Sequence, residues 1–379
     1  MNLRMYFNYS NSLTGRFYAD ILTIYKKYSL GKLVTTFSAL SEAKGIDINM
    51  KAVASFGIVN ADTSGPGAFL RAAKWYWDEL TDMFPAAGFS SIMIPMVPNT
   101  ENVSRNGAPI CTASIRTRFG SPEGYLRYLN DKGVENVEAI TISAQSQFNS
   151  LFETGIPIEK FFDELYNHAK DTVEALQQLK GSTLLVSPTP GIGFLNQTFH
   201  SDEVKIEKFL ADAADCMNRI GEYCEDNHIN LGIRNEYWTL MRGSGIDEFM
   251  KHVDTRLVSY APDPAHLHIA GADAVAFFEK YAKQAKVVCF TDTKFVDESE
   301  VYKTISQEFP QDGRLQRVYY DLGLGEMNFK KIYEILKKAD FDGPVILDSK
   351  YSLDIPKGIL RMRTFWNNLE KNYAAGGVK

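Results

Sequence analysis

Cysteine is scarce in this sequence: only four of the 379 residues are cysteines, and none forms a Cys-x-x-Cys pair. This scarcity argues against a disulfide scaffold or a structural zinc ribbon and indicates a reducing compartment. Long apolar runs are also missing. No run approaches the roughly 20 residues of a membrane-spanning helix, and the N-terminus lacks the apolar stretch of a secretory signal. We therefore expect a cytoplasmic protein with no membrane partner.

A concentration of charge of one sign is absent as well. The formal net charge is −6, and no block of like charges stands out. Nucleic-acid-binding proteins normally carry a basic stripe or patch, so we expect no nucleic-acid partner. With 45% hydrophobic and 23% charged residues, the chain has an ordinary globular composition. Its length allows one large barrel or two smaller domains.

Short apolar runs alternate with longer amphipathic stretches from about residue 51 onward. This alternation is typical of βα units and a parallel sheet. The runs are nearly all apolar and rich in β-branched residues, as strands covered on both faces should be. The predicted strands are residues 51–59, 90–97, 137–143, 182–188, 229–236, 256–263, 286–292 and 343–349.

Eight strands with intervening helices predict an α/β protein with a (β/α)8 TIM barrel over residues 51–375. A doubly wound open sheet is the alternative, but its GxGxxG turn is replaced here by residues 65–67, Gly-Pro-Gly. Residues 1–50 look partly helical and are predicted to form an N-terminal extension packed on the barrel. Residues 98–136 form a long connection after the second strand. Long strand-to-helix connections lie on the active-site face of a barrel, so this one either covers the site or is an exposed elaboration.

Four acidic residues each follow a strand run: Glu236, Asp263, Asp292 and Asp348. The C-terminal ends of barrel strands converge on one face, so these carboxylates are expected to meet there. Together they would repel one another, and a divalent cation would remove that conflict. Oxygen ligands favour Mg²⁺ or Mn²⁺, with Co²⁺ or Zn²⁺ as alternatives. For any single acid, a helix N-cap or a solvated loop position is the simpler interpretation.

Three longer motifs resemble the xylose isomerase-like superfamily of sugar isomerases, epimerases and related lyases. They are DPAHLHIAG (263–271), LKGSTLLVSPTPG (179–191) and LGLGEMNFKKIYEILKKADFDGPVILD (322–348). The resemblance covers roughly residues 51–370. It implies that the four strand-end acids are the metal ligands. It also implies that His266 contacts substrate or metal, although a structural histidine at a helix start is the alternative.

The sequence departs from the family pattern at three places. Where the family has His-x-Lys-Asp, residues 292–295 read Asp-Thr-Lys-Phe. The eighth-strand acid is Asp348 instead of Glu. The second strand ends around Met93 and Met96 instead of an acid. A shifted ion or a bridging water could accommodate the first two changes, and loss of the metal site is the other alternative.

Further side chains near the strand ends are candidates for contact with substrate. The resemblance implies that Lys294 contacts substrate oxygens or orients an acid, and a lowered pKa would also let it donate a proton. Its alternative is an ion pair with a neighbouring carboxylate. Arg234 is predicted either to neutralise the acids and bind a substrate oxyanion, or to form a structural ion pair. Phe56, Tyr237 and Trp238 either wall a sugar pocket or belong to the core.

The leading hypothesis is a metal-dependent isomerase or epimerase acting on a sugar, keto-sugar or polyol through an enediolate, with Glu236 and Asp348 as base and acid. With a leaving group on the next carbon, the same intermediate would make a lyase or dehydratase of a keto-sugar or keto-glycoside. An AP endonuclease-like phosphodiesterase is disfavoured, because its histidine-rich zinc site does not match a chain with six histidines. A non-catalytic sugar-binding barrel is the third alternative. The sequence leaves a homo-oligomer open.

Overall fold

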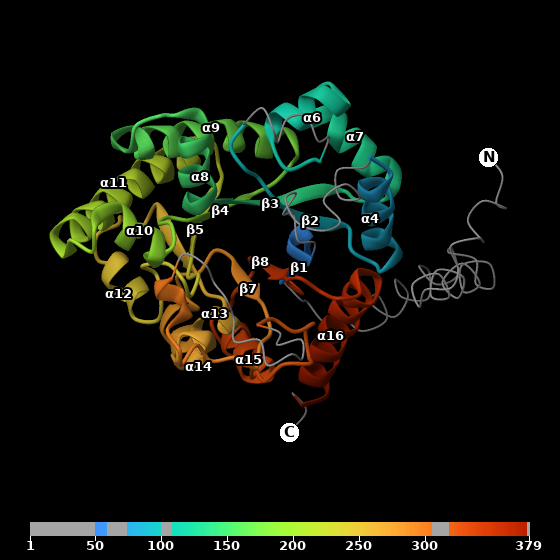
Figure 1. Ribbon diagram of the computed structural model, residues 1–379. Helices are drawn as coiled ribbons and strands as arrows, with labels where there is room; N and C mark the ends of the chain where they lie inside the picture. The colour runs from blue at the N-terminus through green and yellow to red at the C-terminus, as the bar shows by residue number, and fades with distance from the viewer. Residues whose placement is uncertain (1–49, 59–73, 100–107, 305–317, 377–379) are drawn as a thin grey trace, which may run out of the picture. The chain divides into compact units, whose positions relative to one another are not determined.

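Eight parallel strands form the centre of the protein, one in each predicted apolar run (Figure 1). The computed structural model describes residues 50–58, 74–99, 108–304 and 318–376. The predicted N-terminal extension lies outside these residues. The strands are β1 (Lys51–Ser55), β2 (Ser91–Pro95), β3 (Asn136–Ser143), β4 (Thr183–Ser187), β5 (Asn230–Arg234), β6 (Val258–Ala261), β7 (Val288–Phe290) and β8 (Pro344–Leu347).

The strands form one nearly closed barrel. Their hydrogen-bonded order is β6-β5-β4-β3-β2-β1-β8-β7, and every neighbouring pair is parallel. A backbone hydrogen bond of 3.0 Å from the Cys289 N–H to the Pro262 carbonyl joins the two end strands. The prediction of a (β/α)8 barrel is therefore confirmed against the open-sheet alternative.

Helices surround the strands (Figure 1). Ser121 and Asp202 cap two of them, because their side chains accept hydrogen bonds from the Gly124 and Lys205 N–H groups. Within the described ranges, no helix has the length and apolar character needed to cross a membrane. The α-helices are α4 (Lys74–Ala86), α6 (Thr112–Phe119), α7 (Pro122–Lys132), α8 (Ala144–Thr154), α9 (Phe161–Gln178), α10 (Ile192–Phe199), α11 (Glu203–Asp226), α12 (Gly245–Phe249), α13 (Pro264–Ile269), α14 (Ala274–Tyr281), α15 (Phe329–Lys338) and α16 (Ile355–Gly376). The 3-10 helices are η3 (Phe56–Ile58), η4 (Ile158–Lys160) and η5 (Val301–Lys303).

The long connection after β2 contains the helix that the repeat requires. α7 packs against α4, α9 and β3, so it belongs to the outer ring of the barrel. α6 packs on α7 and α9. Residues 100–107 of this connection lie outside the described ranges, so the predicted cover over the active-site face stays a prediction.

One apolar layer fills the inside of the barrel. Its members come from seven of the eight strands or their flanks: Val53, Met93, Ala139, Leu185, Ala261, Val287, Cys289 and Ile346. β5 contributes Gly232 to this layer. A Cβ atom at this position would lie only 2.8 Å from Val287 and 3.1 Å from Leu185, so no side chain fits there. A glycine is required at this position because the inside of the barrel is already full.

The next layer toward the C-terminal ends of the strands is polar. Side chains two residues apart on a strand point to the same face. Residues two positions beyond members of the apolar layer therefore point into the barrel, one layer nearer its mouth. These residues include Ser55, Ser187, Arg234, Asp263 and Asp348, all of which are buried. The barrel thus changes from apolar to charged at the end where barrel enzymes bind their substrates.

Candidate active site

Arg234 and Asp263 form a buried ion pair at the ends of β5 and β6. Arg234 Nη2 lies 3.6 Å from Asp263 Oδ2. The Asp263 carboxylate also caps α13, because Oδ1 accepts the Ala265 N–H at 3.1 Å, and Oδ2 accepts the Thr291 hydroxyl at 2.7 Å. Burial raises the pKa of Asp263, while the positive charges of Lys350 and Arg234 oppose the increase. Asp263 is therefore both a helix N-cap and a member of a charged cluster.

Asp348 follows β8 and faces Gly57, which follows β1. A Cβ atom on Gly57 would lie 2.7 Å from Asp348 Oδ1 and 2.8 Å from Oδ2, so the carboxylate fills space that only glycine leaves. Oδ1 is buried and has no hydrogen-bond partner within the described part of the chain. Burial raises the pKa of Asp348, although Lys350 and Arg234 favour its ionised form. This carboxyl group is suited to hold a proton.

Lys350 and His266 contact each other at the centre of the mouth. Lys350 Nζ lies 2.7 Å from His266 Nε2, and both side chains are buried. The other ring nitrogen, Nδ1, accepts the Tyr237 backbone N–H at 3.3 Å. Burial lowers the pKa of His266 well below its usual value, and the nearby positive charges lower it further. The imidazole is therefore neutral at neutral pH.

Glu236 lies in the turn that follows β5. The Thr239 N–H and hydroxyl both donate to the Glu236 carbonyl, at 3.1 and 2.8 Å, so the backbone of the turn is fixed. The negative charge of Glu236 raises the pKa values of Arg234 and Lys350, which shows that its carboxylate lies near both cations. Its side chain retains 8% exposure, whereas Asp263 and Asp348 retain 0% and 1%. Glu236 is thus the carboxylate most open to a substrate.

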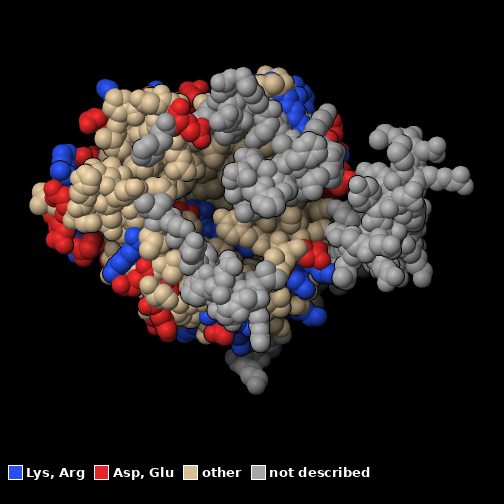
Figure 2. Space-filling view, viewed as in Figure 1, with Lys and Arg blue, Asp and Glu red and all other residues tan. Residues whose placement is uncertain are grey.

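An arginine and a lysine stand among three carboxylates in this cluster. Burial alone would lower the pKa of Arg234, but Cys289, Glu236 and the aspartates around it raise the pKa, so the guanidinium stays charged. Figure 2 shows basic atoms in blue at the bottom of a hollow over the middle of the barrel. The cluster consists of Arg234, Glu236, Asp263, Asp348 and Lys350.

Several buried polar atoms around the cluster lack partners. They are Arg234 Nε, Asp348 Oδ1, Ser187 Oγ and the Tyr319 hydroxyl, each without a hydrogen bond from the described residues. An unsatisfied buried polar group costs about 1–3 kcal/mol, and native proteins contain few of them. A concentration of such groups at one barrel mouth indicates a site for a polar ligand.

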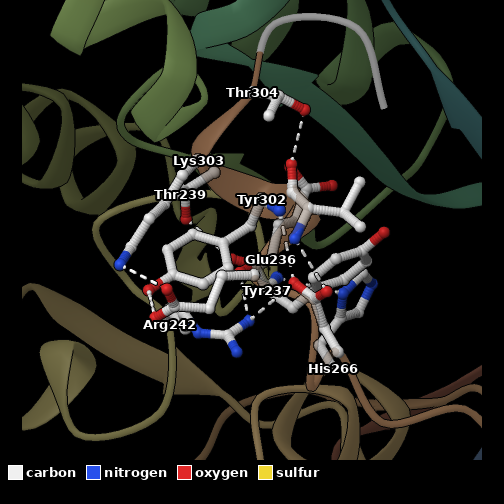
Figure 3. A network of polar contacts seen from close by, with 11 residues as sticks. Glu236, Tyr237, Thr239, Arg242, His266, Tyr302, Lys303 and Thr304 are labelled. Carbon is white, nitrogen blue, oxygen red and sulfur yellow. Dashed lines mark hydrogen bonds and ion pairs between the residues drawn. The ribbon is translucent and has the colours of Figure 1, made fainter. Parts of the chain in front are cut away.

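An outer layer of contacts supports the turn that carries Glu236 (Figure 3). Arg242 Nη1 donates to the Tyr237 carbonyl at 3.0 Å, and its guanidinium lies 3.9 Å from the centre of the Tyr302 ring. Arg242 also pairs with Asp297 at 3.7 Å, and Asp297 accepts the Val301 and Tyr302 N–H groups. The segment around η5 is thereby tied to the backbone that positions the ring of His266.

Asp292 does not belong to the charged cluster. Its Oδ1 accepts the Thr293 and Met327 N–H groups at 3.0 and 3.3 Å, and its Oδ2 accepts the Gly323 and Gly325 N–H groups at 2.9 Å each. A Cβ atom on Gly325 would lie 2.0 Å from Oδ1, so the loop closes tightly around the carboxylate. Asp292 therefore organises the loop before α15, and its prediction as a metal ligand is corrected.

Two other predicted site residues also lie elsewhere. Lys294 is exposed, and its ammonium lies 5.2 Å from the centre of the Tyr320 ring. Phe56 packs in the outer core against Trp77 and Phe84, with ring centres 6.1 and 4.9 Å away. Phe56 is therefore corrected to a core residue, whereas Lys294 lies outside the buried cluster and its contact with substrate stays a prediction. Trp238 lies at the mouth, with its ring centre 5.3 Å from that of His266.

These donors do not fit a divalent cation. Among the described residues, no group of three or more His, Cys, Asp or Glu side chains could hold one. The oxygens of Asp292 are all engaged, and Asp263 accepts two hydrogen bonds and faces Arg234. Arg234 supplies positive charge where the prediction placed an ion. The four-acid metal centre is therefore not assembled.

Sequence reasoning missed Lys350, Tyr319 and Ser187. Lys350 comes two residues after Asp348, so the same alternation that indicated Arg234 could have identified it. The Tyr319 ring lies 5.2 Å from Lys350 Nζ, but no periodicity in the sequence connects these two positions. Ser187 lies two residues after Leu185 on β4, and only the structure shows that Leu185 points into the barrel.

The fold and the site define a class: a (β/α)8 barrel with a charged, buried cluster at the C-terminal ends of its strands. The family model described as xylose isomerase-like TIM barrel matches residues 85–369, and the chain belongs to this family. No curated protein matches the sequence.

Solved structures similar to this chain share its fold at low identity. An L-ribulose 3-epimerase has a TM-score of 0.58 at 13% identity, over 86% of this chain and 96% of that one. A D-tagatose 3-epimerase-like protein has a TM-score of 0.54 at 16% identity, over 86% and 100%. A xylose isomerase-like protein from Mycobacterium smegmatis, in complex with magnesium, has a TM-score of 0.57 at 13% identity, over 85% and 97%.

Proposed function

We propose that the protein is an isomerase or epimerase of a small sugar, keto-sugar or polyol, and that it moves a proton at a carbon beside a carbonyl group. One observation carries the proposal: an arginine, a lysine, three carboxylates and several unpaired polar atoms are buried together at the barrel mouth. Family membership and the epimerases among similar structures agree with it.

The cluster contains the parts that such a reaction needs. Removing a proton beside a carbonyl places negative charge on the carbonyl oxygen, and fixed positive charge stabilises that oxygen. Arg234 provides a permanent positive charge within the buried cluster. Glu236, the most exposed of the three carboxylates, is the proposed base. Asp348, whose pKa burial raises, is the proposed acid.

The magnesium of the Mycobacterium smegmatis protein is not carried over to this chain. Metal chemistry at such a site would stabilise the same oxygen as a Lewis acid. Here Arg234 already supplies positive charge, and the oxygen donors of Asp263 are engaged. The proposed mechanism therefore uses only side chains of the protein.

Proton transfer can be tested without knowing the substrate. The protein is incubated in D₂O with a panel containing L-ribulose, D-tagatose, D-fructose and dihydroxyacetone, and ¹H NMR follows loss of the signal beside the carbonyl. We expect exchange with at least one sugar. Glu236→Gln should slow it by about 10²–10⁴-fold with an unchanged circular dichroism spectrum. Glu222→Gln, on the exposed face of α11, is the matched control.

The same experiment can reject the proposal. If Glu236→Gln exchanged at the wild-type rate, Glu236 would not be the base. If no sugar of the panel exchanged, the proposed activity would be rejected. A protonated Asp348 could also protonate a leaving hydroxyl group, which favours elimination as the second candidate. In that case the enol left by loss of water would tautomerise, and the same spectra would show the signal of a deoxygenated carbon in a dicarbonyl product.

A further inference from the structure

The contact between Lys350 and His266 fixes where their protons lie. A backbone N–H is always a donor, so the Tyr237 N–H at 3.3 Å requires a lone pair on His266 Nδ1. A neutral imidazole carries one proton, which must then be on Nε2. Nε2 lies 2.7 Å from Lys350 Nζ. A hydrogen bond at this distance requires Nζ to accept, and only the neutral amine has a lone pair.

The surroundings of Nζ suit a neutral amine better than an ammonium. An ammonium has three N–H donors to satisfy. Within the part of the chain that the structure describes, His266 Nε2 is the only hydrogen-bond partner of Nζ. The ring faces of Tyr319 and Trp238, with centres 5.2 and 6.0 Å from Nζ, would attract an ammonium, but they offer no hydrogen-bond acceptor for its three N–H groups at this distance.

The charges that face Lys350 come from β5, β6 and β8. Burial lowers the pKa of Lys350, and the guanidinium of Arg234 lowers it further. Asp348, Asp263 and Glu236 act in the opposite direction, and the net result is a lowered pKa. This shift has the direction that the hydrogen-bond geometry requires.

We propose that Lys350 is the nucleophile of this site and that its amine forms an imine with the carbonyl group of the substrate. The proposal rests on the carbonyl substrate of the proposed function. The Nζ lone pair bonds to the carbonyl carbon, and the C=O electron pair moves to oxygen. The C–O bond then breaks as the C=N bond forms. The two Nζ protons leave with the oxygen as water, carried by the carboxyl groups of Glu236 and Asp348.

An imine explains how the site works with side chains alone. Protonation of the imine nitrogen makes it withdraw electrons from the neighbouring C–H bond. A base such as Glu236 can then remove that proton, and the electron pair is delocalised onto nitrogen. His266 is a positioning residue: by donating Nε2–H, it holds Nζ as the neutral amine.

Reductive trapping tests the nucleophile directly. The full-length protein is incubated at neutral pH with dihydroxyacetone and sodium cyanoborohydride, and peptide mapping by mass spectrometry locates the adduct. We expect one reduced adduct per chain, on Lys350. Lys350→Met should lose this adduct, whereas Lys286→Met, which removes an exposed lysine at the opposite end of β7, should keep it. His266→Asn should trap at least about tenfold more slowly at neutral pH and recover at alkaline pH, where the amine loses its proton unaided.

The outcomes separate this proposal from the proposed function. Adducts spread over exposed lysines with Lys350 unmodified would overturn it, as would wild-type D₂O exchange by Lys350→Met. Exchange in D₂O that continues without trapping at Lys350 would leave the proton-transfer function standing and reject the imine. Trapping at Lys350 without exchange on any sugar would support the nucleophile and reject the proton transfer.

Discussion

Replacement of Asp292 distinguishes a loop anchor from a metal ligand. In the structure its carboxylate accepts four backbone N–H groups, two on each oxygen. Asp292→Ala would leave all four donors without that acceptor. Asp292→Asn keeps one acceptor oxygen but turns an NH₂ group toward the other two N–H groups.

The expected loss of stability follows from these contacts. Each buried donor that loses its partner costs about 1–3 kcal/mol. The loop glycines are only partly buried, so water can replace some of the lost bonds. We expect Asp292→Ala to lower the free energy of unfolding by about 3–5 kcal/mol, and Asp292→Asn by about 2–4 kcal/mol.

Urea unfolding followed by tryptophan fluorescence measures both losses, with and without Mn²⁺. The control is Asp212→Asn, which removes an exposed ion pair with Lys208 and should change stability by less than about 1 kcal/mol. A loop anchor predicts large losses that Mn²⁺ does not alter. Variants as stable as wild type that merely fail to respond to Mn²⁺ would refute the assignment and restore Asp292 as a ligand.

Three further outcomes are expected. Gly57→Ala should slow D₂O exchange by about 100-fold without unfolding the protein, because its Cβ would displace the Asp348 carboxylate; an unchanged rate would contradict the role of Asp348. EDTA should leave both the exchange rate and the melting temperature unchanged, and a rise in melting temperature on adding Mn²⁺ would show a metal site. Burial lowers the pKa of His168 to about 4 from 6.5. The unfolded chain therefore binds this proton first as pH falls, and wild-type stability should drop by about 1.4 kcal/mol per pH unit between these values. Urea unfolding of His168→Gln should show a shallower dependence, and an equal slope would contradict burial of this histidine.

The barrel could be predicted because its strands are buried on both faces. Apolar β-branched runs such as residues 182–188 differ from the amphipathic helices between them, and each run proved to contain a strand. The end of a strand is harder to predict. β7 stops at Phe290, and Asp292 then forms an isolated antiparallel bridge with Tyr320.

The early end of β7 explains why Asp292 was predicted wrongly as a metal ligand. Alternation of side chains holds only while the chain stays extended. The four N–H donors of Asp292 come mainly from a loop some 30 residues later, and no local pattern connects the two segments. The interpretation of Arg234 was more successful, because it rested on β5, which is regular up to that residue.

The carboxylates at the barrel mouth can be balanced without a metal ion. Four strand-end carboxylates suggest a cation, but the cation need not be a metal ion. In this chain the guanidinium of Arg234 faces Asp263 and favours the ionised form of Asp348, so a side chain of the protein supplies the positive charge. An arginine stays charged at any physiological pH, whereas a buried lysine can lose its proton. Placing one of each in the cluster gives a fixed charge for a developing oxyanion and an amine that can react with a carbonyl group, a division of roles that a single metal ion would not provide.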